Sequence, residues 1–198
     1  MQVTVVILTK LPGHLPVKTR LVPALGEAGA RAVYLEMLRE TVALARCLTP
    51  RPIIAYSPPE ATPVLPGIEG CELRPVAGDD GATCLENAIA DAYESGTPLL
   101  ALGGDAPDLP LERLEQVTAL LCDDEVDAVL VPAHDGGFSC LGVRRPAPGL
   151  ARGFRYGCAD TLASLRAFFA TRGLVTAVLE PWPDIDTPQD LEDYRNRS

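Results

Sequence analysis

Lysine is scarce in this sequence, which contains only Lys10 and Lys18 among its 198 residues. The chain holds 17 basic and 27 acidic residues and carries a formal net charge of −10 at pH 7. Such an excess of negative charge repels phosphate at long range, so we expect no nucleic acid or anionic membrane as a partner. No apolar stretch approaches the roughly 20 residues of a membrane span, and no basic segment precedes the apolar run at 3–8. We therefore expect a cytoplasmic protein.

Histidine is equally scarce, and cysteine occurs without metal-binding spacing. Only His14 and His134 are present, and the closest pair of the six cysteines, Cys71 and Cys84, lies thirteen positions apart. Without a CxxC pair, a zinc ribbon or a thioredoxin-like redox motif is excluded, and reduced thiols are favoured. The glycine patterns GxxxxGK[ST] and GxGxxG are also absent, which argues against P-loop hydrolases and classical dinucleotide-binding enzymes.

Short apolar runs alternate with amphipathic segments along the whole chain. The apolar runs predict strands at 3–9, 53–57, 71–76, 98–103, 126–132, 137–143 and 174–180. Apolar residues at helical spacing predict helices at 27–48, 82–95, 110–122, 159–171 and 188–195. This alternation predicts an α/β fold of three layers (α/β/α) with a mostly parallel sheet, in a single domain spanning residues 1–198. Because ligands of such sheets bind beyond the carboxyl ends of the strands, the loops there are the candidates for a site.

The loop at 10–21, after the first predicted strand, concentrates positive charge. It contains both lysines and Arg20, and Gly13 offers a bare backbone. The first 51 residues carry seven basic and three acidic residues, whereas the rest of the chain carries ten and twenty-four. Lysine and arginine at the end of a strand can bind phosphate oxygens, arginine through a bidentate fork. We interpret Lys10, Gly13, Lys18 and Arg20 as a phosphate-binding loop, with a merely solvated basic loop as the alternative.

A second polar stretch, GGDAPD, follows the strand predicted at 98–103. Asp105 comes directly after this apolar strand, where its carboxylate can hold Mg²⁺ against nucleotide phosphates. Gly104 beside it lets a ligand approach the backbone. Asp108 precedes the next predicted helix, and we expect it to be the N-cap of that helix.

A third stretch, Asp135-Gly136-Gly137, connects the strands predicted at 126–132 and 137–143. These residue types suit a tight turn. The bare N–H groups of such a turn can equally bind a polar group of a substrate, so both interpretations stay open. The three residues are candidates for substrate binding.

A fourth stretch precedes the last predicted helix. Thr187 and Pro188 match an N-cap followed by proline at the first helical position. Asp184 and Asp186 lie just before this cap, and the helix does not require them. Two carboxylates there can supply a further metal ligand.

Together these four segments resemble one family, transferase 1, rSAM/selenodomain-associated, which is often labelled glycosyltransferase. The shared motifs are VKTRL at 17–21, PALG at 23–26, GGDAPDL at 103–109, DGGF at 135–138 and DIDTPQDL at 184–191. They occur in the family's order and spacing, and the resemblance covers nearly the full chain. Two positions depart from the pattern: His134 replaces a usual acidic residue, and the family's glutamine-containing Gly-Asp segment is altered at 77–81.

The resemblance implies a GT-A-like, Rossmann-type fold of the nucleotide-diphospho-sugar transferase superfamily. Similar relatives are 2-phospho-lactate guanylyltransferase and the molybdenum-cofactor nucleotidyltransferases. In these relatives the first loop holds the nucleotide phosphates, and aspartates that match Asp105 and Asp186 hold Mg²⁺. The resemblance therefore implies that Lys18, Arg20 and Asp105 are catalytic and that Asp105 and Asp186 bind Mg²⁺ or Mn²⁺. The nucleotide donor is expected to contact Lys10, Gly13, Lys18, Arg20 and Gly104.

Three functions remain open on this basis. Nucleotidyl transfer from a nucleoside triphosphate to a small phosphorylated or hydroxylated acceptor needs cations on the leaving pyrophosphate, which the basic loop supplies. Glycosyl transfer from a nucleotide-diphospho-sugar fits the family label, although Asp105-Ala106-Pro107 lacks the second aspartate of a DxD motif. A degenerate nucleotide-binding module is the third alternative. The sequence leaves the oligomeric state open, with a homodimer as one alternative.

Overall fold

A computed structural model describes residues 2–94 and 96–197 of the chain. The described residues form a seven-stranded sheet in the order β3-β2-β1-β4-β6-β5-β7. Neighbouring strands are parallel except around β6, which runs antiparallel to both β4 and β5. The strands are β1 Thr4–Lys10, β2 Ile53–Ser57, β3 Glu72–Pro75, β4 Leu99–Gly103, β5 Ala128–Pro132, β6 Phe138–Val143 and β7 Thr176–Val178.

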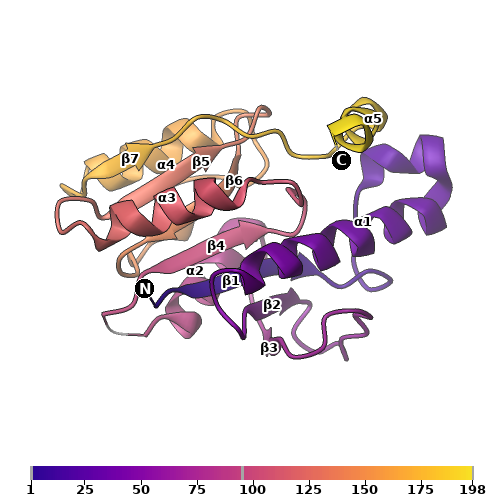
Figure 1. Ribbon diagram of the computed structural model, residues 1–198, viewed down its shortest axis with the longest axis horizontal. Helices are drawn as coiled ribbons and strands as arrows, with labels where there is room; N and C mark the ends of the chain where they lie inside the picture. Colours follow the sequence, from indigo (N-terminus) through magenta and orange to yellow (C-terminus); the bar gives the residue numbers. More distant parts are fainter. Residues whose placement is uncertain (1, 95, 198) are drawn as a thin grey trace.

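Helices cover both faces of the sheet, so the molecule has three layers (Figure 1). Helices α1 and α3 pack on one face, and α2 and α4 pack on the other. The helices are α1 Val22–Arg46, α2 Gly81–Ala92, α3 Leu111–Cys122, α4 Thr161–Ala170 and α5 Pro188–Arg197, with 3-10 turns η1 at Thr19–Leu21 and η2 at Leu150–Arg152. None of the described helices combines the length and apolar character that crossing a membrane would require.

The strand β1 shows why a continuous apolar run forms the centre of this sheet. Its side chains alternate between the two layers, because Val5 and Ile7 pack with α1 and α3 while Val6 packs with α2. All three side chains are buried. Burying one such side chain stabilises the fold by about 1.5–3 kcal/mol. A strand that is covered on both faces can therefore be apolar throughout, without polar residues at alternate positions.

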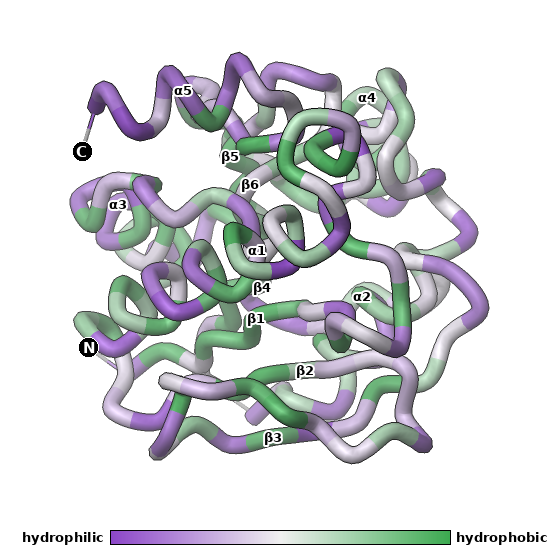
Figure 2. The backbone as a smooth tube through the Cα atoms, turned by 90° about the vertical axis from the view of Figure 1, so that its right-hand side faces the viewer, coloured by the Kyte–Doolittle hydropathy of each residue, from purple (hydrophilic) through white to green (hydrophobic). Residues whose placement is uncertain are grey.

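The helix α5 packs against the first half of α1 rather than against the sheet (Figure 1). Figure 2 shows that α5 is mostly hydrophilic, and its buried residues are Leu191 and Tyr194. These two side chains join Ile185, which is fully buried, and Met37 of α1 in a separate apolar cluster. This cluster fixes the segment before α5 next to the loop that follows β1.

The predicted α/β fold with a mostly parallel sheet is confirmed, and every predicted strand and helix has a counterpart. The range of α1 covers two helical segments that meet at a kink at Gly26, where φ is 69° and ψ is 169°. The helix predicted from residue 27 corresponds to the segment after this kink, and the short segment at 22–25 was not predicted. The expectation that Asp108 caps α3 is wrong. The N-cap is Pro110, and the Asp108 carboxylate instead accepts hydrogen bonds from Trp182 Nε1 (3.1 Å) and Arg197 Nε (2.9 Å).

Candidate functional site

The loop that follows β1 is held in place by a buried tyrosine of α1. The Tyr34 hydroxyl shares a hydrogen bond of 2.7 Å with Thr9 Oγ1 and accepts one of 3.1 Å from the Lys10 backbone N–H. Burial raises the pKa of Tyr34, even though its hydrogen bond with Thr9 acts in the opposite direction. A neutral, buried phenol thus anchors the point at which the chain leaves the sheet.

Lys18 is the centre of the candidate site. Its Nζ donates to Asp186 Oδ1 at 2.7 Å and to Asp105 Oδ2 at 3.2 Å, and its side chain is only 4% exposed. Burial lowers the pKa of Lys18, but the two carboxylates outweigh this effect and the net pKa is raised. Its backbone has a φ of 44°, in the left-handed region that residues other than glycine adopt infrequently. The structure therefore joins three predicted site residues that lie up to 168 positions apart.

Arg20 supplies a second cation to the same carboxylate. Its Nη1 donates to Asp186 Oδ2 at 3.0 Å, while 64% of the Arg20 side chain remains exposed. Lys10 is exposed at the end of β1, and the ion pairs of the described residues do not include it. Arg20 and Lys10 therefore present positive charge to solvent, as a phosphate-binding loop requires.

Backbone hydrogen bonds fix the two aspartate segments relative to each other. The Ile185 N–H donates to the Asp105 carbonyl at 3.2 Å. The Asp190 carboxylate accepts from the backbone N–H groups of Asp186 (3.1 Å) and Thr187 (2.6 Å), and Thr187 Oγ1 accepts in return from the Asp190 N–H (3.3 Å). This reciprocal arrangement is a capping box, so the predicted capping role of Thr187 is confirmed.

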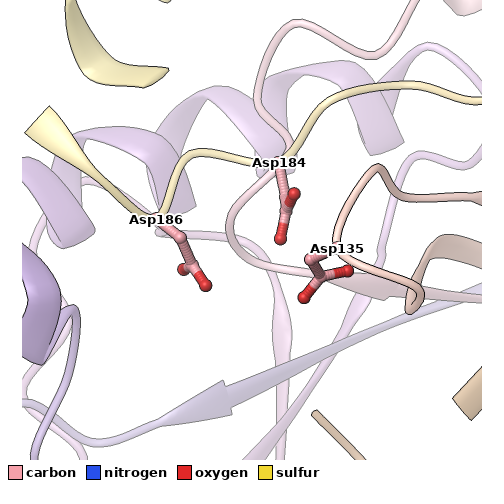
Figure 3. A group of neighbouring side chains, drawn as sticks. All are labelled: Asp135, Asp184 and Asp186. Carbon is pink, nitrogen blue, oxygen red and sulfur yellow. The ribbon is translucent and has the colours of Figure 1, made fainter. Parts of the chain in front are cut away.

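Three carboxylates converge (Figure 3), and one of them, that of Asp186, contacts Lys18. Asp184 and Asp186 come from the segment before α5, and Asp135 comes from the turn between β5 and β6. One oxygen of each lies within 4.8 Å of the others, which suits the oxygen ligands of a divalent cation. Burial, followed by repulsion from the neighbouring carboxylates of Asp135, Asp186 and Asp105, raises the pKa of Asp184 to about 6.

The aspartates therefore form two overlapping groups around Asp186. The pair predicted from sequence, Asp105 and Asp186, is bridged by the Lys18 ammonium. The other group consists of Asp186 with Asp135 and Asp184. The chemistry of this donor set fits Mg²⁺ or Mn²⁺, which both accept carboxylate oxygens. Metal ligation by Asp105 and Asp186 stays a prediction.

The predicted substrate turn packs closely against the start of α4. Gly136 has a φ of +91°, and a Cβ there would lie 2.2 Å from the Ala159 carbonyl oxygen. The Gly136 carbonyl accepts from the Leu162 N–H at 2.9 Å, and the Gly137 N–H donates to Asp135 Oδ1 at 2.8 Å. Only glycine fits at position 136, so this turn holds Asp135 in a defined place.

The other two predicted glycines have different surroundings. Gly104 is buried, and a Cβ there would lie 3.3 Å from Leu38 of α1. Gly104 therefore packs closely against α1. Gly13 is exposed with a φ of +95°, and a Cβ there would lie 3.2 Å from the guanidinium of Arg31.

Sequence reasoning missed an aromatic residue beside the acidic group. Tyr156 is 44% exposed, and its ring meets Phe138 edge-on with centroids 5.7 Å apart. The same ring covers Gly81 at the start of α2, where a Cβ would lie 3.0 Å from the tyrosine Cγ. Tyr156 lies in a loop without helical or strand periodicity, so no pattern in the sequence distinguishes it.

Glu86 is a second missed residue, and it holds the loop that contains Tyr156. Its two carboxylate oxygens accept the backbone N–H groups of Gly149 (2.6 Å) and Ala151 (2.7 Å). These bonds attach the 3-10 turn η2 to α2 across 63 and 65 positions of the sequence. Nothing in the helical pattern around Glu86 indicates this long-range role.

Two cavities lie apart from the acidic group. One of about 240 Å³ opens between β2, β3 and α2, and one of about 620 Å³ lies near the amino ends of β1 and β2. Neither is lined by Lys18, Asp105 or Asp186. The candidate site lies at the carboxyl ends of the strands, where ligands of such sheets bind.

Comparison with known proteins gives a family and a set of similar folds. The family model described as "Uncharacterized protein conserved in bacteria (DUF2064)" matches residues 40–158. No curated protein is similar enough to the chain to be matched.

Among solved structures, a Desulfovibrio desulfuricans protein, provisionally named a nucleotide-diphospho-sugar transferase, is 26% identical with a TM-score of 0.85. That match covers 100% of this chain and 89% of the other. The 2-C-methyl-D-erythritol 4-phosphate cytidylyltransferase of Thermus thermophilus is 17% identical with a TM-score of 0.60, covering 100% of both chains. Rv0371c of Mycobacterium tuberculosis, in a complex with manganese, is 16% identical with a TM-score of 0.59, again covering 100% of both. The last two likenesses, both below 25% identity, establish the α/β fold alone.

Proposed function

The chain belongs to the DUF2064 family, and we propose that it transfers a nucleotidyl group from a nucleoside triphosphate to a small acceptor in a metal-dependent reaction. The second product would be pyrophosphate. The observation that carries this proposal is the meeting of Lys18 and Arg20 with Asp105 and Asp186 at the carboxyl ends of the strands. We also propose that the chain is a member of the rSAM/selenodomain-associated transferases, which its motifs resemble.

The basic loop would bind the triphosphate. Arg20 keeps most of its side chain in solvent and can give phosphate oxygens a bidentate contact. Lys10, exposed at the end of β1, adds a point charge to the loop. Gly13, with its positive φ, keeps the loop backbone accessible. These groups would stabilise the negative charge of the leaving pyrophosphate.

The aspartates would hold a divalent cation. Asp105 and Asp186 are the ligands that the sequence motifs favour, and Asp135 and Asp184 lie beside Asp186. A bound Mg²⁺ or Mn²⁺ would neutralise negative charge on the phosphates of the donor. The Rv0371c structure with manganese supports this proposal through the fold that the two proteins share.

The acceptor would lie between the turn at Asp135 and the ring of Tyr156. The turn carries Asp135 of the acidic group, and Tyr156 interacts electrostatically with the same carboxylate. Gly136 and Glu86 keep the two loops in place. The Tyr156 ring offers an apolar surface, and the carboxylates offer acceptors for hydroxyl groups. A hydroxylated acceptor suits this side of the site better than a phosphorylated one, because the carboxylates repel phosphate.

Glycosyl transfer from a nucleotide-diphospho-sugar is the second candidate. Two observations favour it: the provisional name of the Desulfovibrio protein, and the D-x-D spacing of Asp184-Ile185-Asp186, whose two carboxylates face Asp135. The two reactions release different products, because nucleotidyl transfer yields pyrophosphate and glycosyl transfer yields a nucleoside diphosphate. The released product therefore distinguishes them.

The test begins with thermal unfolding in the presence of four nucleoside triphosphates and the UDP-, GDP- and dTDP-sugars, each with and without Mg²⁺ or Mn²⁺. A ligand at 100 times its dissociation constant stabilises the native state by about 2.7 kcal/mol, which gives a measurable rise in melting temperature. A metal-dependent rise with one triphosphate, followed by pyrophosphate release, supports nucleotidyl transfer. A rise in melting temperature with a sugar nucleotide and with its nucleoside diphosphate supports glycosyl transfer. If no ligand raises the melting temperature, both reactions are excluded.

Two variants test the residues. Asp105→Asn should abolish turnover and leave the melting temperature of the free protein within a few degrees of the wild type. Asp124→Asn is the matched control, because its carboxylate is fully exposed on the surface and pairs with Arg144. Normal turnover by Asp105→Asn would disprove the assignment of Asp105.

A further inference from the structure

The Lys18 ammonium lies between the two carboxylates that the proposed function assigns to a divalent cation. Its Nζ is 2.7 Å from Asp186 Oδ1 and 3.2 Å from Asp105 Oδ2. Magnesium binds carboxylate oxygens at about 2.0–2.1 Å and holds its ligands close to octahedral positions. A cation bound by these same two oxygens would meet the ammonium at contact distance, so the two cannot occupy the site together.

The charge of the site is consistent with such an exchange. Four carboxylates gather there, and two cations contact them, which leaves a formal excess of two negative charges. With Lys18 in place, its positive charge offsets the repulsion between the carboxylates of Asp105 and Asp186. If Lys18 moved away, a divalent cation would offset that repulsion instead.

Lys18 in its present position does not face a ligand in solution. Its side chain is 4% exposed, whereas that of Arg20, two positions later, is 64% exposed. A lysine that binds donor phosphates must therefore leave the two carboxylates first. The flexible four-carbon stem of lysine permits such a movement without a change of the backbone.

We propose that Lys18 is an internal counter-ion that holds the place of the divalent cation between Asp105 and Asp186, and that metal binding releases it toward the phosphates of the donor. The exchange rests on the proposed function, because it requires the metal to use these two aspartates. It couples the two binding events: the metal exposes a cation for the donor, and the donor retains Lys18 outside the metal position. Metal and donor therefore bind with positive cooperativity.

The scarcity of lysine makes a direct test possible in the wild-type protein. Labelling lysine with ¹⁵N at Nζ gives signals from Lys10 and Lys18 alone, and the variant Lys10→Met assigns them. We expect the Lys18 ammonium signal to show slow exchange with water, because its contacts with Asp105 and Asp186 shield it. Adding Mg²⁺ should shift this signal toward that of a free, rapidly exchanging ammonium. An unchanged Lys18 signal at a Mg²⁺ concentration that saturates the protein would overturn the proposal.

Metal affinity provides the second test, with the metal alone as the probe. Binding of Mn²⁺ is measured by electron paramagnetic resonance for the wild type, for Lys18→Met and for Lys10→Met. Lys18→Met removes the competing charge and should tighten Mn²⁺ binding by about tenfold, a difference of about 1.4 kcal/mol. Lys10→Met loses the same charge from the same loop without touching the carboxylates, so its affinity should stay within about twofold of wild type. Equal or weaker Mn²⁺ binding by Lys18→Met would overturn the exchange.

Stability gives an independent readout in the same variants. Without metal, Lys18→Met leaves Asp105 and Asp186 without their shared cation, so its melting temperature should fall below that of the wild type. Mn²⁺ should restore it, and by a larger increment than in the wild type. If this variant does not fold, the ¹⁵N experiment on the wild-type protein still tests whether Mg²⁺ displaces Lys18.

Failure of this exchange can be distinguished from failure of the proposed function. Metal-dependent turnover together with an undisturbed Lys18 signal would overturn the exchange and retain the transferase. Displacement of Lys18 by Mg²⁺ without turnover of any nucleotide would retain the exchange and overturn the transferase.

Discussion

Replacing Asp184 by asparagine should stabilise the metal-free protein. This carboxyl is partly buried next to three other carboxylates, and burial followed by their repulsion raises its pKa from 3.8 to about 6. Asparagine has nearly the same shape and no charge, so Asp184→Asn removes the cost of ionising this group. The gain should appear only where the wild-type carboxyl is ionised.

The sign and size of the effect follow from proton linkage. A raised pKa means that the native state binds the proton more tightly than the unfolded chain, so the wild type loses stability as the pH rises from 3.8 to about 6. At 1.36 kcal/mol per pH unit this interval corresponds to about 3 kcal/mol. Because Asp184 is partly exposed, solvent screening reduces the expected gain to about 1 kcal/mol at pH 7.5. At pH 4 about a fifth of that gain remains, because the native carboxyl is then protonated while that of the unfolded chain is only partly ionised.

Urea unfolding at pH 7.5 and pH 4, in buffer containing EDTA, measures this difference. The expected gain at pH 7.5 corresponds to a rise in melting temperature of about 2–4 °C for a chain of this size. The control is Asp124→Asn, whose fully exposed carboxylate should change stability by less than about 0.5 kcal/mol at either pH. A loss of stability at pH 7.5, or an equal gain at both pH values, would refute the electrostatic reasoning.

Three further sets of substitutions test how the loops of the site are held. Gly136→Ala should lower the urea unfolding free energy by about 3 kcal/mol, because its Cβ would meet a carbonyl oxygen at 2.2 Å. Gly157→Ala, with φ +74° and open space around the Cβ, should cost about 1 kcal/mol in the same assay. Glu86→Gln should cost about 1–2 kcal/mol and raise the KM for the acceptor more than that for the donor, measured by steady-state kinetics. Tyr34→Phe removes a buried hydroxyl with two hydrogen-bond partners and should weaken triphosphate binding several-fold in calorimetry.

The strands and helices can be predicted because their patterns are local. The apolar run at 3–9 is continuous since both faces of β1 are covered, and that property is visible in the sequence itself. The capping role of Thr187 is equally visible, because its box with Asp190 spans only four residues. The helix predicted from residue 27 matches the segment of α1 that follows the kink at Gly26, whereas the short segment at 22–25 before the kink was not predicted.

Long-range pairing explains why the prediction for Asp108 is wrong. Its position before a helix suggests a cap, whereas its carboxylate bonds Trp182 and Arg197, 74 and 89 positions away. Pro110, which is extended and directly precedes the first helical residue, takes the cap position. A residue's neighbours in sequence therefore give no indication of the partners that the sheet topology brings to it.

The candidate site depends both on local sequence motifs and on contacts between residues far apart in the sequence. The motifs identify the segments that carry Lys18, Asp105 and Asp186, because each follows a strand and all strands but one are parallel, so their loops share one edge of the sheet. The motifs do not indicate that Lys18 bridges the two aspartates, since this contact depends on how the cluster around Ile185 holds the last segment against α1. Assigning Lys18 to phosphate and the aspartates to metal as separate roles treats the groups as independent. Their distances of 2.7 and 3.2 Å show that each group is the partner of the other, so any ligand that binds one must change the surroundings of the rest.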